Sequence, residues 1–216
     1  MNKIPVIILL GAPGAGKGTQ AAVLSRQMSI PKISTGDMLR QAVHEDTELG
    51  RRVKGIMNDG KLVDDQTMLD LIVARIEKPD CRNGFILDGY PRNLEQVRQF
   101  ESVCDPKWHL CAIDIEVSEE EIVKRIAGRR TCPGCQRIYN IYFQPPVGDE
   151  RCDFDQSVLY TRDDDREEVV RRRLNTYRIE TKPLVEHYNR MGILKVVNGI
   201  QPVEEVAKEI SKTIQC

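Results

Sequence analysis

A glycine-rich string near the N-terminus contains the residue types that point most directly to chemistry. The string Gly11-Ala-Pro-Gly-Ala-Gly-Lys-Gly-Thr19 directly follows an apolar run from Pro5 to Leu10. Glycines let consecutive backbone N–H groups turn toward phosphate oxygens, and a helix that follows adds its positive N-terminal end. The lysine adds mobile charge over the outer phosphates, although the hydroxyl residue comes one place later than in the simplest form of this motif. The string therefore predicts a loop that binds the phosphates of a nucleotide, rather than an ordinary glycine-rich turn.

Two further strings stand at the ends of predicted strands. The first is Ser34-Thr-Gly-Asp-Met-Leu-Arg40, and the second is Asp88-Gly-Tyr-Pro-Arg92, with Gln96 shortly after it. Open α/β sheets bind ligands at the carboxyl ends of their strands, where a guanidinium group grips a phosphate in two places. Taken alone, Arg40 fits a solvated helix arginine, and Asp88 fits a cap for its turn. An aspartate that ends an apolar strand also suits the water shell of a Mg²⁺ ion on nucleotide phosphates.

A group of arginines lies in the second half of the chain. Arg125 and Arg129 are four residues apart on a predicted helix, so they project from one face and form a cationic clamp. Arg162 and Arg173 bracket the start of a later helix. Three neighbouring arginines are more simply explained as surface residues that pair with Glu167 or Glu168, and we assign them no role: Arg166, Arg171 and Arg172.

Three cysteines and an aspartate have the spacing of a metal site. Cys132-Pro-Gly-Cys135 is followed, after an intervening 16 residues, by Cys152-Asp-Phe-Asp155. Two such pairs make a zinc-ribbon pattern, in which a carboxylate oxygen is an acceptable fourth ligand. We expect a closed, structural Zn²⁺ site formed by Cys132, Cys135, Cys152 and Asp155, with Asp149 and Asp153 as alternative carboxylates. A metal-free segment held by polar contacts remains the other possibility, whereas a redox Cys-x-x-Cys lacks its usual strand-then-helix context.

Alternating apolar runs and helical patterns indicate what positions these residues. Short apolar runs predict the strands of a parallel sheet covered by helices, at residues 5–10, 31–34, 85–87, 110–117 and 193–197. We therefore predict an α/β core at residues 1–33, 64–127 and 166–216. Residues 34–63 are helical without an apolar strand, and residues 128–165 are rich in Gly, Pro, Cys and aromatic residues, so both are predicted to be insertions.

Composition bounds the remaining function classes. The chain has 216 residues with 32 basic and 33 acidic side chains, so its net charge of -1 favours neither nucleic acid nor an anionic membrane as partner. The first apolar run is far shorter than the roughly 20 residues of a membrane span. Seven cysteines, an odd number, suit a reducing compartment. We expect a cytoplasmic monomer, and the three histidines show no spacing typical of a catalytic triad.

The three strings in this order resemble those of adenylate kinases, specifically the form with a long lid. The resemblance covers essentially all 216 residues. It implies a P-loop NTPase core with a five-stranded parallel sheet, an AMP-binding insertion at 34–63 and a lid at 128–165. The implied activity is reversible phosphoryl transfer from Mg-ATP to AMP, giving two ADP and maintaining the adenine nucleotide balance.

The resemblance also implies a role for individual residues. It implies catalytic roles for Lys17, Asp88, Arg92, Arg125, Arg129, Arg162 and Arg173. It implies contacts with ATP from Gly14, Ala15, Gly16, Lys17, Gly18, Thr19, Arg125, Arg129, Ile138, Tyr139 and Gln201. It implies contacts with AMP from Thr35, Arg40, Lys61, Leu62, Val63, Gly89, Tyr90, Arg92, Gln96, Arg162 and Arg173.

Two other functions stay open on the sequence. A UMP-CMP-type or GTP:AMP kinase would use the same core with a different acceptor or donor base. Thr35 and Gln96 argue for an adenine acceptor, whereas the donor base is weakly encoded because the family's contacts with it are largely made by backbone. A zinc-ribbon module that binds nucleic acid and uses the nucleotide as a switch is the alternative outside enzymes. The neutral net charge and the spread of the arginines over both nucleotide sites argue against the second.

Overall fold

A five-stranded parallel sheet forms the centre of the protein. The computed structural model describes residues 3–214, so Cys216 and the outermost ends of the predicted core segments lie outside the described residues. The strand order is β2-β3-β1-β4-β7, with bounds Lys32–Ser34, Phe85–Asp88, Ile4–Leu10, Trp108–Glu116 and Leu194–Asn198. All four neighbouring pairs are parallel, which confirms the predicted α/β class. The central strand β1 therefore delivers the glycine-rich loop to the middle of the sheet's carboxyl edge.

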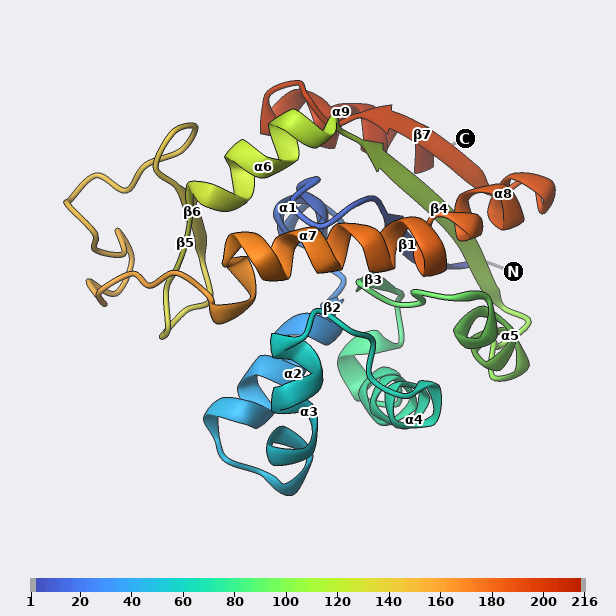
Figure 1. Ribbon diagram of the computed structural model, residues 1–216. Helices are drawn as coiled ribbons and strands as arrows, with labels where there is room; N and C mark the ends of the chain where they lie inside the picture. Colours follow the sequence, from blue (N-terminus) through green and yellow to red (C-terminus); the bar gives the residue numbers. More distant parts are fainter. Residues whose placement is uncertain (1–2, 215–216) are drawn as a thin grey trace.

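Helices cover both faces of this sheet, as the apolar strands require (Figure 1). On one face, residues such as Ile7 and Ile113 pack with α1 (Lys17–Met28) and α9 (Val203–Ile214). On the other face, residues such as Ile8 and Phe85 pack with α4 (Asp65–Ile76), α5 (Leu94–Ser102) and α8 (Pro183–Arg190). A short 3₁₀ helix, η1 (Pro79–Cys81), precedes β3. None of the helices within residues 3–214 is long and apolar enough to cross a membrane.

Side-chain caps begin most of the helices. Ser118 accepts a hydrogen bond from the backbone N–H of Glu121 at the start of α6 (Glu119–Ala127), as its spacing predicts. Ser34, Asp64 and Asn93 do the same for three further helices. Ser34 ends β2, so its cap turns the chain directly from the sheet into the first insertion.

The two predicted insertions project from the core as separate segments (Figure 1). The first contains α2 (Thr35–His44) and α3 (Glu48–Asn58). The second contains the antiparallel pair β5 (Arg129–Thr131) and β6 (Ile138–Asn140), drawn in yellow. Its buried cluster has only four members, Cys132, Tyr139, Cys152 and Leu159. A cluster this small explains why the second insertion needs a further constraint on its shape.

A long helical run connects the insertions with the core. It contains η2 (Asp163–Asp165), α7 (Glu167–Thr176), the π-helical turn η3 (Tyr177–Thr181) and α8. The hydroxyl of Thr181 donates to the carbonyl of Arg92 at 2.7 Å, and that of Thr176 donates to the carbonyl of Gly60 at 3.1 Å. One continuous helical run therefore contacts both the string that follows β3 and the end of the first insertion.

Candidate active site

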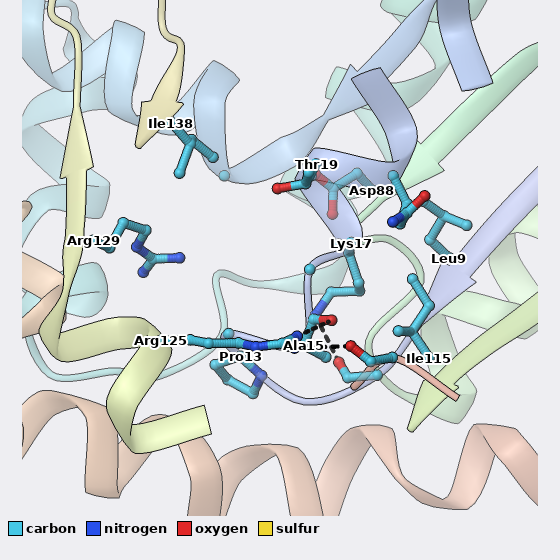
Figure 2. Close-up of a pocket in the computed structure, with 18 of the residues that line it drawn as sticks. Leu9, Pro13, Ala15, Lys17, Thr19, Asp88, Ile115, Arg125, Arg129 and Ile138 are labelled. Atoms are coloured by element: carbon cyan, nitrogen blue, oxygen red, sulfur yellow. Dashed lines mark hydrogen bonds between the residues drawn. The ribbon is translucent and has the colours of Figure 1, made fainter. Parts of the chain in front are cut away.

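The glycine-rich loop joins β1 to α1 in a conformation that favours glycine. Gly14 and Gly16 have φ of 85° and 102°, and Gly16 is the residue that precedes α1. A side chain at Gly14 would also collide with Ile126, since an added Cβ would lie 2.8 Å from its Cγ1. Lys17 folds back across the loop, and its ammonium group donates to the carbonyls of Gly11 and Ala12 at 2.6 and 2.9 Å (Figure 2). The loop is therefore already curled in the form that cradles phosphate.

Two cavities meet beside this loop. The larger has a volume of about 720 Å³, and the smaller has about 60 Å³. Every residue predicted to contact ATP lines the larger one. The smaller one is lined by most of those predicted to contact AMP, namely Thr35, Arg40, Lys61, Leu62, Val63, Gly89, Arg92, Gln96 and Arg173. Arg40, Arg92 and Arg173 line both cavities, so they stand where the two spaces join.

Cations dominate this junction. The larger cavity is lined by Lys17 and six arginines, Arg40, Arg92, Arg125, Arg129, Arg162 and Arg173. Burial, opposed by Asp88 and assisted by nearby arginines, lowers the pKa of Lys17 to about 8. Burial likewise lowers the pKa of Arg92 and of Arg162 to about 10, helped by neighbouring arginines. Such crowding of buried positive charge favours a polyanionic ligand.

Three aspartates neutralise part of this charge. Arg40 donates to Asp37 at 2.6 Å, Arg129 donates through Nε to Asp165 at 2.7 Å, and Arg173 lies 2.9 Å from Asp164. Burial alone would raise the pKa of Asp37, but Arg40 and Lys32 bring it well below its usual range. Arg162, which is 6% exposed, donates through Nε to the hydroxyl of Thr131 in β5. These bonds hold the arginines of the second insertion in fixed positions over the cavity.

The smaller cavity contains groups suited to a base. Thr35 donates to the carbonyl of Gly89 at 2.8 Å. Gln96 is 1% exposed; its Oε1 accepts from the N–H of Arg92 at 2.8 Å, and its Nε2 donates to Asp65 at 2.9 Å. An amide has two donor hydrogens and two lone pairs, so one of each stays available. Gln96 therefore enters the cavity wall with its orientation already set.

Tyr90 differs from the expectation. The sequence places it among the residues that contact AMP, but Tyr90 lines neither cavity. Its ring is 1% exposed and packs edge-on against Phe100, with the ring centroids 5.8 Å apart. An apolar ring beside a buried core gains more from packing there than from facing a polar cavity. The side chain of Tyr90 thus supports the site from behind.

The far wall of the larger cavity combines the loop, α6 and the segment after β7. Arg125 donates to the carbonyl of Gly199 at 2.9 Å and lies 3.4 Å from the carbonyl of Ala15. Arg129 and Ile138 approach from the second insertion, opposite Thr19 and Asp88 (Figure 2). A flat aromatic ligand between Arg125 and Ile138 would contact an apolar side chain and a guanidinium plane together.

The cysteine cluster lies in the second insertion. The ligand atoms of Cys132, Cys135, Cys152 and Asp155 all lie within 4.8 Å of one another. Cys135 Sγ is 3.5 Å from Cys152 Sγ, and Cys132 Sγ is 3.2 Å from an oxygen of Asp155. Zn–S bonds of about 2.3 Å in a tetrahedron require sulfurs roughly 3.8 Å apart, so the donor set fits zinc. Asp153 instead accepts from the N–H of Val147, which leaves Asp155 as the carboxylate among the thiols.

Comparison with known proteins identifies the family of this chain. A family model described as adenylate kinase matches residues 9–193. This chain belongs to the adenylate kinase family. An adenylate kinase of Archaeoglobus fulgidus is 46% identical over 211 residues, 97% of each chain. One of Acetivibrio thermocellus is 45% identical over 206 residues, 94% of this chain and 95% of the relative.

Membership in the adenylate kinase family establishes the class of reaction. The chain is a phosphotransferase that moves a phosphoryl group from ATP to AMP, giving two ADP. A reaction between two nucleotides needs two neighbouring sites, and the two cavities described above share lining residues.

Several residues of the site were not anticipated by sequence reasoning. Gln20, Asp65, Thr176 and Thr181 hold site residues or loops through hydrogen bonds. Gln20 directly follows the phosphate-loop string, so its place in the sequence could have drawn attention to it. The other three lie far along the chain from their partners and carry no local signal. Arg172, which received no role, donates to the carbonyl of Asp59 at 3.0 Å.

Proposed function

We propose that Mg-ATP occupies the larger cavity and AMP the smaller, with the phosphoryl group passing at their junction. The observation that carries this assignment is the set of three arginines, Arg40, Arg92 and Arg173, that lines both cavities. A cation shared by two cavities can contact a donor phosphate and an acceptor phosphate at once. It therefore acts where charge accumulates during transfer.

The proposed mechanism needs no protein nucleophile. The loop from Gly14 to Thr19 holds the donor phosphates with backbone N–H groups, while Lys17 follows the charge at the outer end. Arg125 and Arg129 fix the donor, and Arg40 and Arg92 fix the acceptor phosphate. Arg162 and Arg173 stabilise the equatorial oxygens between them. Thr19 and Asp88 are the residues that would hold Mg²⁺ and its waters, and this ion would neutralise phosphate charge.

The proposal gives each insertion a task. Residues 34–63 close over AMP, and residues 128–165 close over ATP as a lid, which keeps water from the phosphoryl group. A structural Zn²⁺ ion held by Cys132, Cys135, Cys152 and Asp155 would fix the shape of the lid. The remaining segments, residues 1–33, 64–127 and 166–216, form the rigid core.

We further propose a monomer that works in the cytoplasm and maintains the adenine nucleotide balance. Both cavities are lined by residues of a single chain, so the reaction needs no second copy. The described cysteines are all free, in keeping with a reducing compartment. Elution at about twice the mass of one chain in size-exclusion chromatography would contradict the monomer.

The reaction is tested with purified protein, Mg²⁺ and pairs of nucleotides. ADP formation from ATP and AMP is expected to exceed that from ATP with CMP, UMP or no acceptor. Metal analysis of the same sample is expected to give about one zinc per chain. If AMP adds nothing to the rate without acceptor, the assignment of the two cavities is wrong.

A matched pair of variants tests the junction. Arg173→Lys keeps the charge but loses the planar fork, so kcat is expected to fall roughly 10²-fold or more while the fold is retained. Arg171→Lys on the same helix changes an exposed residue paired with Glu167 and is expected to keep wild-type kcat. Equal kcat for the two variants would remove the shared arginines from the mechanism.

A further inference from the structure

Gln20 is a buried amide outside the roles given above. It lies in α1 one turn after Lys17, is 3% exposed and lines the larger cavity. Its Nε2 donates to the carbonyl of Val203 at 3.0 Å, across 183 residues of sequence. Its Oε1 is fully buried and has no hydrogen-bond partner. A buried oxygen without a partner lowers stability, so an apolar side chain would suit this position better if packing alone mattered.

The partner of Gln20 belongs to the segment that forms the end wall of the donor cavity. Residues 199–203 run from the end of β7 to the first residue of α9, and all five line the larger cavity. The segment is fastened at its first residue, where Gly199 donates to the carbonyl of Glu116 and accepts from Arg125. It is fastened at its last residue by Gln20. Between these two ends, the side chain of Gln201 is exposed and reaches away to Glu209.

The direction of the Gln20 amide follows from this contact. If the amide were rotated by half a turn, its oxygen would face the carbonyl oxygen of Val203, and two acceptors would repel. The bond therefore fixes the amide, and together with the apolar packing between α1 and α9 it sets how far the segment lies from α1. Since α1 also carries Lys17 and Thr19, the distance between the base end and the phosphate end of the donor cavity depends on this bond.

We propose that Gln20 is a positioning residue for the donor nucleotide, which sets the segment 199–203 at the distance that accepts the base of ATP. This inference rests on the proposed function, because it assumes that ATP occupies the larger cavity. Backbone groups of this segment can distinguish adenine from guanine only if the segment is held at a fixed distance from the loop that binds the phosphates. Loss of the bond should therefore weaken donor binding and donor-base discrimination, and leave the AMP site unaffected.

Gln20→Met tests this proposal because it keeps the volume and removes the hydrogen bond. The KM for ATP is expected to rise roughly three- to tenfold, the range that one hydrogen bond supports. The ratio of kcat/KM for ATP over GTP is expected to fall, and the KM for AMP is expected to stay unchanged. The melting temperature is expected to hold or rise, because the unpaired oxygen is removed. A residue with a merely structural role would not separate donor kinetics from stability in this way.

Ser25→Ala is the matched control on the same helix. Ser25 donates to the carbonyl of Ile30 at 2.6 Å, so its loss is expected to lower the melting temperature without moving the KM for ATP. If Gln20→Met does not fold, Gln20→Leu gives the same comparison, because its neutral apolar side chain cannot donate a hydrogen bond. Equal rises in the KM for ATP and for AMP, or no rise, overturn the inference while the wild type still makes ADP. A wild type that makes no ADP from ATP and AMP overturns the proposed function itself.

Discussion

Asp114 is a buried carboxylate that the proposed reaction does not use. It lies near the end of β4, is 5% exposed and leaves Oδ1 without a hydrogen-bond partner. Burial and the nearby Glu116 raise its pKa to about 6, although Lys17 and Lys182 act in the opposite direction. Burial, with a contribution from the Asp114 carboxylate, raises the pKa of the Tyr177 phenol to about 12. Ionisation of Asp114 is therefore less favourable in the folded protein than in the unfolded chain.

The sign of the resulting pH dependence follows from the raised pKa. The folded protein holds this proton between the unfolded value of 3.8 and about 6, so stability falls as the pH rises through that window. Asp114→Asn removes the charge and is expected to raise the free energy of unfolding at pH 8 by about 2 to 3 kcal/mol. The gain should vanish near pH 4. Urea unfolding at both pH values measures it, and an equal gain at each pH would contradict the explanation.

At the scale of single elements, strand β6 joins the lid cluster to the donor cavity. Tyr139 of this strand lines the larger cavity, yet its hydroxyl lies 3.4 Å from the sulfur of Cys152 and accepts from the N–H of Asp153. Burial by itself would raise the pKa of Cys152, but hydrogen bonds, first that of Tyr139, lower it overall. A donor beside a thiolate ligand orients it and tunes its bond to a metal.

We predict that Tyr139→Phe loosens the Zn²⁺ ion proposed above without unfolding residues 128–165. Loss of the hydroxyl is expected to speed zinc transfer to a chromogenic chelator roughly tenfold or more. Tyr142→Phe is the control, since Tyr142 is 63% exposed and its ring packs on Phe143 instead of the cluster. The readout is the rate of metal release, which does not depend on activity. Identical release rates from the two variants would leave Tyr139 as a packing residue only.

At the scale of the whole molecule, α7 contacts the end of the first insertion and an aspartate that pairs with an arginine of the second. Arg172 donates to the carbonyls of Asn58 and Asp59 at 3.2 and 3.0 Å, and Thr176 donates to that of Gly60. These carbonyls stand at the end of α3, where a cation is favourable for the helix dipole. One residue further along, Arg173 reaches Asp164 beside the lid. The end of the first insertion is therefore bonded to the helix that carries Arg173.

Arg172→Ala is predicted to weaken this link at the AMP side. Because Arg172 is exposed, its bonds contribute modestly, and the KM for AMP is expected to rise about two- to fivefold with a smaller change for ATP. Arg171→Ala, which loses only its pair with Glu167 within α7, is expected to match the wild type. Steady-state kinetics with each nucleotide varied in turn decides between them. A larger change for ATP than for AMP would mean that the helix serves the donor side.

Local strings made the fold and much of the site predictable. The phosphate loop, the Cys132 to Asp155 spacing and the apolar strands each depend on neighbours in sequence, so their chemistry shows in a short window. Contacts such as Gln20 with Val203, or Thr181 with Arg92, join residues from distant segments and depend on packing. Tyr90 shows the limit of such local patterns. It stands inside a string predicted to bind AMP, but its ring is buried in the core.

The lid leaves the core and returns to it at almost the same point. Thr131 and Tyr160 pair through two backbone hydrogen bonds of 2.9 and 3.0 Å, so the chain between them begins and ends side by side. The entropy cost of closing a segment between two paired ends grows only slowly with its length, by about 0.6 kcal/mol for each doubling. The lid is thus an exchangeable module: a shorter or metal-free segment grafted between these two residues would leave the sheet, the phosphate loop and the AMP site intact.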